Sequence, residues 1–441
     1  MSTHSAIPIY RLQAVDKLLG FAACALAQPF RLARWLVRRE GETREILVVK
    51  FWGIGSLQLL TPAVAVLRRR YPEARLTLLT LAENGEFARG LGVYDEVKTL
   101  DIHSRSWTTI LTRLVTLVRG LRRAGFDQVY DFEFFTRFSA LVSLLSSARE
   151  LHGFRSPSVW RGGFHSRTVT FNRYWHVARN FRALAQGEDG TEVLPRDVLP
   201  FRVDQATAGR LEERLVRAGW QRGQPYAVIN PNAGRLSLER RWPQSSYAAL
   251  VRRLIEEDDL TVVLIGAHGE RAYTGEVAHQ AQDRGSATET PPVIDLSGAL
   301  TQAELCSLLA NATVVVSNDS GPMHLAAALG APTVGLFGPE TPVMYRPLGA
   351  TVRVLYEPPV CSPCINVHDN KVATCIHGRP ECLVNISVEA ALEATRALLH
   401  DPTAQPQEGA AWRVLAGTGD DRAKAEARAT SERADTEPAT G

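Results

Sequence analysis

The sequence predicts an α/β protein built from two doubly wound domains that face each other across a cleft. Apolar strands alternate with helical segments on both sides of a polar stretch at 187–205. Two of the strands, ILVVKF (46–51) and TVVVSND (313–319), run directly into a glycine-containing turn and a helix. This alternation is typical of right-handed β–α–β units in parallel sheets. Ligands of such sheets bind beyond the carboxyl ends of the strands, so the site is expected there.

The composition narrows the class of protein. The chain has 441 residues, enough for two domains of ~150–200 residues each. Hydrophobic residues make up 45% and charged residues 22%, as in soluble globular enzymes. These values argue against a disordered, collagen-like or polytopic membrane protein. The net charge of +3 gives no support for a nucleic-acid partner.

Residues 1–40 form an N-terminal extension that has some features of membrane-associated segments. LLGFAACALA (18–27) resembles a signal peptide, but the run is short and Asp16 lies beside it. It is also shorter than the ~20 residues that a spanning helix needs. RLARWLVRR (31–39) has a basic and an apolar helical face. Such a helix either lies on an anionic membrane or packs on the first domain. We expect a cytoplasmic protein held at the inner face of the membrane.

The first domain is expected over 41–200 and the second over 201–400, with a disordered, apolar-poor tail at 401–441. In the first domain the expected elements are strands at 46–51, 74–81, near Val97 and at 126–133, and helices up to Arg70, near Glu86, at 106–124 and at 139–147. In the second domain they are strands at 226–231, 261–267, 313–319 and 332–338, and helices at 247–257, from 304, from 320 and from 387. Thr301 and Glu304 form a capping-box pattern at one of these helices.

Three motifs lie at strand-to-helix junctions. Gly53-Ile54-Gly55-Ser56 allows close approach to a helix N-terminus, although no acidic residue follows at the distance that a nicotinamide ribose requires. SNDSGPMH (317–324) places Asp319, Ser320, Gly321 and His324 at a helix start that would suit a diphosphate. NPNAG (230–234) contributes Asn232 and Gly234 and precedes the pair Arg240 and Arg241. Guanidinium groups bind phosphate in a bidentate manner. Each motif alone also fits a turn, a helix cap or surface arginines.

Together these stretches resemble glycosyltransferase family 9, the lipopolysaccharide heptosyltransferases. The resemblance rests on NPNAG with RRWP, SNDSGPMHLAAALGAPTVGLFGPETP, Cys-Ser-Pro-Cys and the opening VVKFWGIGSLQLLTPAVAVLRRRYP. It implies a glycosyltransferase B fold, with the acceptor on the N-terminal domain and the nucleotide sugar on the C-terminal domain. It also implies inverting transfer, without a metal, from an ADP-heptose-like donor to a lipid-linked saccharide. Arg240 or Arg241 would contact the diphosphate, and Asp319, Ser320, Gly321 and His324 would line the donor site.

Ser56 departs from this family, which usually has an aspartate there as general base. A serine without a neighbouring base does not accept a proton at neutral pH. Three explanations stay open. Asp131 or, preferably, Glu133 supplies the base from the end of a neighbouring strand; transfer relies on positioning and leaving-group stabilisation; or the chain has lost catalysis. Both acids would otherwise bind loop amides.

Four late cysteines suggest a local site: Cys361, Cys364, Cys375 and Cys382. A C-x-x-C pair and two later thiols can close a tetrahedral zinc site, with His368 or His377 as substitute ligands. Disulfides and free buried thiols are the alternatives. Any such zinc would be structural, and no cofactor is expected to be needed for catalysis.

Three other functions compete with transfer. A sugar-nucleotide epimerase would use the same cleft without a lipid acceptor. A non-catalytic nucleotide-sugar sensor would explain Ser56. A thiol-based redox or metal-binding module depends only on the late cysteines.

Overall fold

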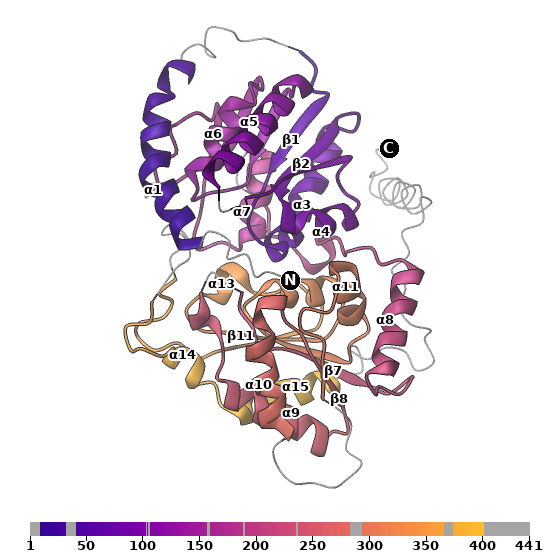
Figure 1. Ribbon diagram of the computed structural model, residues 1–441. Coiled ribbons are helices and arrows are strands. Elements are labelled where there is room, and N and C mark those ends of the chain that lie inside the picture. The colour runs from indigo at the N-terminus through magenta and orange to yellow at the C-terminus, as the bar shows by residue number, and fades with distance from the viewer. Residues whose placement is uncertain are drawn as a thin grey trace, which may run out of the picture.

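A computed structural model describes residues 9–31, 41–102, 104, 106–156, 159–187, 190–234, 237–282, 293–365 and 374–400. These residues form two parallel six-stranded sheets, each covered by helices, stacked one above the other (Figure 1). The prediction of two doubly wound α/β domains is confirmed. The predicted boundary near residue 200 falls between the last helix of the upper domain and the first helix of the lower one.

The N-terminal sheet has the strand order β3-β2-β1-β4-β5-β6. From β1 the strands β2 and β3 are added on one side and β4 to β6 on the other, so the topological switch point lies between β1 and β4. Ligands of such sheets bind at the switch point. Ile46 to Val49 of β1 are fully buried, as a strand covered on both faces requires. In chain order the elements are β1 (Glu45–Val49), α3 (Ile54–Arg70), β2 (Arg75–Leu81), α4 (Gly85–Gly90), β3 (Glu96–Leu100), α5 (Trp107–Ala124), β4 (Gln128–Asp131), α6 (Arg137–Leu145), β5 (Glu150–Arg155), β6 (Arg167–Thr170) and α7 (Val177–Gln186).

The C-terminal sheet, β12-β11-β10-β7-β8-β9, repeats this order, so its switch point lies between β7 and β10. The capping box predicted at Thr301 and Glu304 is formed at the start of α11. In chain order the elements are α8 (Gln205–Arg217), β7 (Tyr226–Asn230), α9 (Gln244–Glu256), β8 (Thr261–Leu264), α10 (Arg271–Gln282), β9 (Val293–Asp295), α11 (Gln302–Ala310), β10 (Val314–Asn318), α12 (Gly321–Ala328), β11 (Thr333–Phe337), α13 (Pro342–Tyr345), β12 (Val352–Tyr356), α14 (Glu381–Val384) and α15 (Val388–Leu399).

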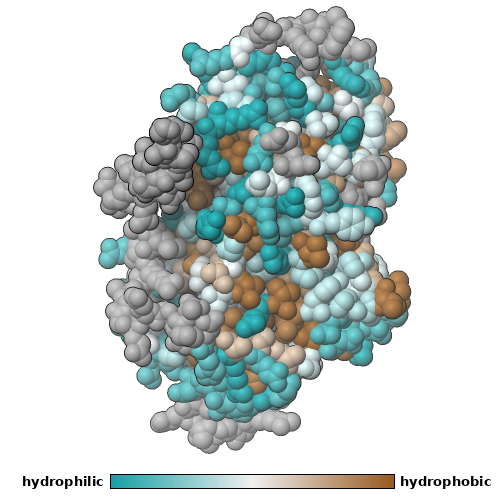
Figure 2. All heavy atoms as spheres, turned by 180° about the vertical axis from the view of Figure 1, so that it is seen from behind, coloured by the Kyte–Doolittle hydropathy of each residue, from teal (hydrophilic) through white to brown (hydrophobic). Residues whose placement is uncertain are grey.

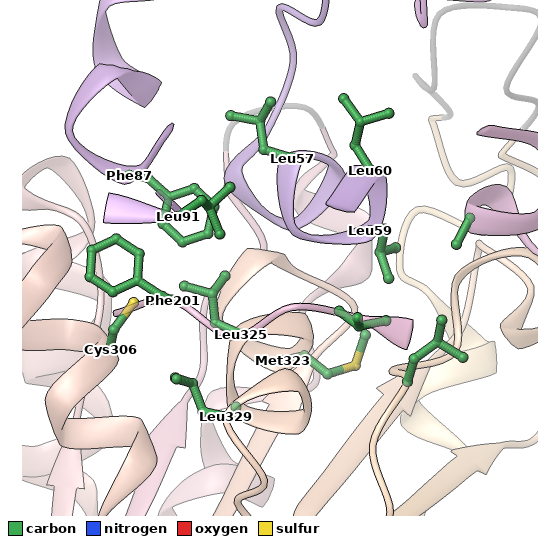
Figure 3. Packing of buried hydrophobic residues seen from close by; sticks show 14 of the residues in the cluster. Leu57, Leu59, Leu60, Phe87, Leu91, Phe201, Cys306, Met323, Leu325 and Leu329 are labelled. Atoms are coloured by element: carbon green, nitrogen blue, oxygen red, sulfur yellow. The ribbon is translucent and has the colours of Figure 1, made fainter. Parts of the chain in front are cut away.

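An apolar contact joins the two domains. Helix α3 of the upper domain packs on α12 of the lower one, and α4 packs on α11. Figure 3 shows Leu59 pointing towards Met323, and Phe87 and Leu91 lying above Cys306 and Leu325. Burial of this surface favours a closed arrangement of the domains. The contact lies beside the cleft and therefore sets how closely the two switch points approach.

The N-terminal helix α1 (Ile9–Leu26) packs on α6. Its Asp16 accepts hydrogen bonds from the backbone N–H groups of Phe138 (2.8 Å) and Arg137 (3.1 Å), at the start of α6. Just beyond the helix, Gln28 donates to the Gly162 carbonyl (3.0 Å). Among the described residues, no helix combines the length and apolar character needed to cross a bilayer. Most of the basic segment 31–39 and the whole tail 401–441 lie outside the described residues, so the predictions for them stay predictions.

Candidate functional site

The switch points of both sheets open into one cavity of about 960 Å³. Strand register explains this, because Val49 pairs with Asp131 and Ser317 pairs with Asn230, so the carboxyl ends of the paired strands are level. The loops after β1 and β4 form the upper wall, and the loops after β7 and β10 form the lower wall. The predicted motifs are therefore brought together, although they lie far apart in the sequence.

Helix α12 begins at this cavity without a side-chain cap. Its N-cap residue is Ser320, whose hydroxyl makes no capping bond. That hydroxyl instead receives a hydrogen bond from Asn230 Nδ2 (2.9 Å) and lies 3.0 Å from Ser317 Oγ. The first N–H groups of the helix thus keep their donors for a ligand at the positive end of the dipole.

Helix α3 of the other domain begins at the same place, also without a side-chain cap. Its N-cap residue Gly53 has φ 79°, a conformation that favours glycine. A Cβ on Gly55 would lie 2.8 Å from His324 Cδ2 and 3.1 Å from Gly321 Cα. The two helix starts therefore meet nearly backbone to backbone. Two positive helix ends at one point make a site suited to an anion such as a diphosphate.

Arg240 lies beside this point and lines the cavity. Its Nη1 donates to the Asp319 backbone oxygen (2.8 Å) and lies 3.3 Å from the Asp319 carboxylate, and its Nη2 donates to the Ala233 carbonyl (2.6 Å). Its Nε has no hydrogen-bond partner within the described part of the chain. The hydrogen bonds of Arg240 thus fix its position, and its Nε–H group is available to donate to a ligand. Asp319 balances the charge of Arg240.

Arg241 points elsewhere. It pairs with Glu270 (3.3 Å) and lies over the Tyr273 ring, 4.1 Å from the centroid, and it does not line the cavity. The other sequence-predicted donor and loop residues do line it, namely Asn232, Gly234, Arg240, Asp319, Ser320, Gly321, His324, Gly53 and Gly55. Of the two arginines that the resemblance offers for the diphosphate, the geometry favours Arg240.

The three predicted catalytic residues do not all reach the cavity. Ser56 lines the cavity, whereas Glu133 and Asp131 do not. Glu133 is fully buried, pairs with Lys50 Nζ (2.8 Å) and accepts from the backbone N–H groups of Phe51 (2.7 Å) and Trp52 (3.1 Å). It therefore holds the loop that leads to α3. This matches the amide-binding alternative, and the geometry does not favour Glu133 as the base.

Asp131 is likewise buried behind the wall, in an ion pair with Arg161 and 3.3 Å from His165 Nε2. Burial acts to raise the pKa of Asp131, but Arg161 and His165 outweigh it and hold this pKa below its usual value. A carboxylate in this setting is a weak base. The geometry assigns it to the support of the β4–α6 loop, where Arg161 Nε also donates to the Thr136 carbonyl (2.8 Å).

Several residues of the cavity wall were missed from the sequence. Glu340 and Tyr345 follow β11. The available signal was FGPETP (337–342), which contains Glu340 and ends three residues before Tyr345. Asp16 comes from α1, and nothing in the sequence indicated that this helix would line the cavity. Burial raises the pKa of Asp16, while the backbone N–H groups of Arg137 and Phe138 oppose that shift.

The predicted zinc site is not formed by the described residues. Among them, no three His, Cys, Asp or Glu side chains are grouped so as to hold a metal. Cys382 is buried, Cys364 is exposed, and Cys375 donates to the Arg379 carbonyl (2.9 Å). No disulfide is present among these cysteines, His377 is exposed, and His368 lies outside the described residues. Four thiols could serve zinc chemically, but the described residues do not bring them together around one ion, and the zinc site stays a prediction.

A comparison with protein families decides the class. The model of glycosyltransferase family 9 (heptosyltransferase) matches residues 114–374, more than half of the chain. This chain belongs to glycosyltransferase family 9. It is a glycosyltransferase, as the sequence predicted, and nothing supports the epimerase alternative. The matched region includes the Asn232, Arg240 and Asp319 motifs but begins after Ser56.

Relatives of this glycosyltransferase agree with the assignment. Lipopolysaccharide heptosyltransferase 3 of Escherichia coli is 25% identical over 305 residues, which covers 66% of this chain and 83% of that protein. The solved structure of E. coli ADP-heptose lipopolysaccharide heptosyltransferase II matches with a TM-score of 0.62 and 22% identity, over 81% of this chain and 98% of that one. A family 9 glycosyltransferase from Veillonella parvula matches with a TM-score of 0.65 and 20% identity, over 82% and 99%. These structures support the glycosyltransferase B fold.

Proposed function

We propose that this glycosyltransferase moves a heptose from an ADP-heptose-like donor to a lipid-linked saccharide of the lipopolysaccharide-core type, with inversion and without a metal. The names of its relatives support the donor and acceptor classes. The observation that carries the proposal is the meeting of two uncapped helix starts beside Arg240, in a cavity shared by both domains.

The proposed chemistry follows from this arrangement. The nucleotide diphosphate lies against the start of α12 and Arg240, and the acceptor hydroxyl enters from the Gly53 side. When that hydroxyl attacks the anomeric carbon, negative charge develops on the departing diphosphate. Preorganised N–H groups and a guanidinium stabilise such charge more than water does. The closed domains also exclude water and so limit hydrolysis of the donor.

The proposed transfer has no dedicated general base. Glu133 and Asp131 lie behind the cavity wall in ion pairs. Of the three explanations for Ser56, the one that fits best is therefore catalysis by positioning and leaving-group stabilisation. Glu133→Gln tests the alternative. We expect its transfer rate to stay within about tenfold of wild type once folding is matched, whereas losing a general base costs roughly 10²–10⁴-fold. Ser56→Ala should also remain active.

The proposal is tested with purified protein and a panel of nucleotide sugars. A donor present at a hundredfold excess over its Kd should stabilise the protein by about 2.7 kcal/mol, read as a thermal shift. We expect ADP-heptose to give the largest shift and to be consumed only when acceptor is added. Binding without turnover on any acceptor would favour the sensor alternative, and no shift with any nucleotide sugar would refute the proposal.

We also propose peripheral attachment to the inner face of the cytoplasmic membrane. Large hydrophobic side chains are exposed along α1 and just after it, among them Leu18, Phe21, Leu26 and Phe30. Seen from behind, hydrophobic side chains appear at the right-hand edge of the upper domain (Figure 2). Such side chains enter the interface between headgroups and acyl chains. Co-sedimentation with anionic vesicles should fall in a Leu18→Gln/Leu26→Gln variant, and unchanged sedimentation would refute this attachment.

A further inference from the structure

The cavity has two unlike halves. The half formed by the C-terminal domain is polar and holds the donor motifs. The other half extends under α1 and α5, with α6 between them, and its walls are aliphatic and aromatic. We call this second half the apolar arm; its walls include Leu19, Ala23, Leu111, Leu114, Phe138 and Leu141.

The apolar arm is open to solvent although its walls are hydrophobic. Leu19 is 64% exposed and Leu111 is 60% exposed. Exposed apolar surface of this kind, gathered in a concave site, is typical of a binding site for an apolar ligand. Because the arm and the donor motifs belong to one cavity, the same ligand can reach both.

The near absence of charged side chains from the described walls of the apolar arm argues against a polar ligand there. Asp16 is the one ionisable residue that α1, α5 and α6 contribute to the cavity wall among the described residues. Its carboxylate oxygens accept hydrogen bonds from the N–H groups that start α6, so they already have partners within the fold. A peptide or a saccharide would leave its own polar groups unpaired against these walls. A hydrocarbon chain has no polar groups and therefore loses no hydrogen bonds when it lies against these walls.

The arm is a built feature of the fold. Asp16 fixes α1 to the start of α6, Gln28 donates to the Gly162 carbonyl, and the rings of Phe21 and Trp160 lie 5.0 Å apart. Gly20 lies so close to α6 that an added Cβ would be 3.1 Å from Arg137 Cβ. Helix α1 thus forms one wall of the site at a fixed distance from α6.

We propose that the apolar arm binds a hydrocarbon chain of the lipid-linked acceptor, so that the lipid enters between α1 and α5 while its saccharide reaches the helix starts of α3 and α12. This inference depends on the proposed transfer to a lipid-linked acceptor. It goes further by placing the chain inside the protein instead of leaving it in the membrane.

The test uses the full chain and a fluorescent single-chain fatty acid, cis-parinaric acid, below its micelle concentration. Wild type should bind it saturably. Leu111→Gln should bind about tenfold more weakly, the effect of losing burial of one leucine side chain. Ala23→Phe, which fills the arm, should abolish binding. The matched control is Val115→Gln, one turn along α5, which is exposed but does not line the cavity.

Lipid-bearing acceptor should displace the probe, and the same saccharide without its chain should not. Equal probe binding in all variants, or no saturable binding in wild type, would overturn the inference. So would a Leu111→Gln protein that loses only vesicle binding, since the surface would then be a membrane contact. Because probe binding needs no turnover, failure of transfer with normal probe binding overturns the proposed function alone. Equal KM values for chain-bearing and chain-free acceptors overturn the inference alone.

Discussion

Gly55→Ala probes the contact between the two helix starts. The added Cβ would lie 2.8 Å from His324 Cδ2 and 3.1 Å from Gly321 Cα. Carbon atoms prefer separations of about 3.5–4.0 Å, so the two starts must move apart by roughly 0.7 Å. A displacement near 1 Å at a reacting centre can cost about 10²-fold in rate. We therefore expect kcat/KM to fall by roughly 10–100-fold, or up to about 2.7 kcal/mol in barrier height.

Stability separates this effect from unfolding. Gly55 has helical backbone geometry, where alanine is favoured over glycine by up to about 1 kcal/mol. This gain offsets part of the packing cost of the added Cβ, so the variant should stay folded and its unfolding temperature should change little. The control is Gly209→Ala in α8, where an added Cβ meets nothing within 4 Å. It should gain up to about 1 kcal/mol and keep full activity. Steady-state kinetics and thermal unfolding measure both; a fully active Gly55→Ala protein would refute the proposed contact.

Three further predictions follow from the site. Lys50→Met leaves the buried Glu133 carboxylate without its cation and should cost about 3–5 kcal/mol in urea unfolding; Lys50→Met/Glu133→Gln, which removes the charge but keeps an oxygen for the Phe51 and Trp52 N–H groups, should restore part of this loss. Arg240→Lys should raise the donor KM about tenfold or more, whereas Arg241→Lys should leave it nearly unchanged. Burial lowers the pKa of His176, whose Nε2 lies 2.9 Å from the Arg346 carbonyl of the other domain, to about 4. Stability should thus fall as pH drops from 6.5 towards 4, and less so in His176→Asn; equal pH profiles would contradict this.

The sequence located the donor side of the site because strands and turns are local features. Each motif follows an apolar strand, and parallel strands end at the same edge of a sheet. Asn230, Ser317 and Gly53 therefore came together as the pattern predicted. Short strands escaped prediction: Glu150–Arg155 contains a glycine, and Arg167–Thr170 is a largely exposed four-residue strand at the sheet edge.

Long-range pairing could not be read from the sequence. Glu133 was expected at the correct strand end, but its partner Lys50 lies 83 positions away. Whether that carboxylate faces the cavity or the loop amides depends on packing that no local pattern encodes. The same holds for α1, which reaches the cavity only because Asp16 meets the start of α6, more than 100 residues later. The late cysteines show the same limit, since C-x-x-C spacing fixes only one pair of thiols, and the described residues do not gather a metal-binding group there.

A crystal structure with bound ADP tests the central claim most directly. We expect the diphosphate at the start of α12, with phosphate oxygens within hydrogen-bond distance of the Gly321 N–H group and the Arg240 guanidinium, and with the adenosine on the C-terminal domain. A diphosphate bound away from that helix start, or on the N-terminal domain, would contradict the account.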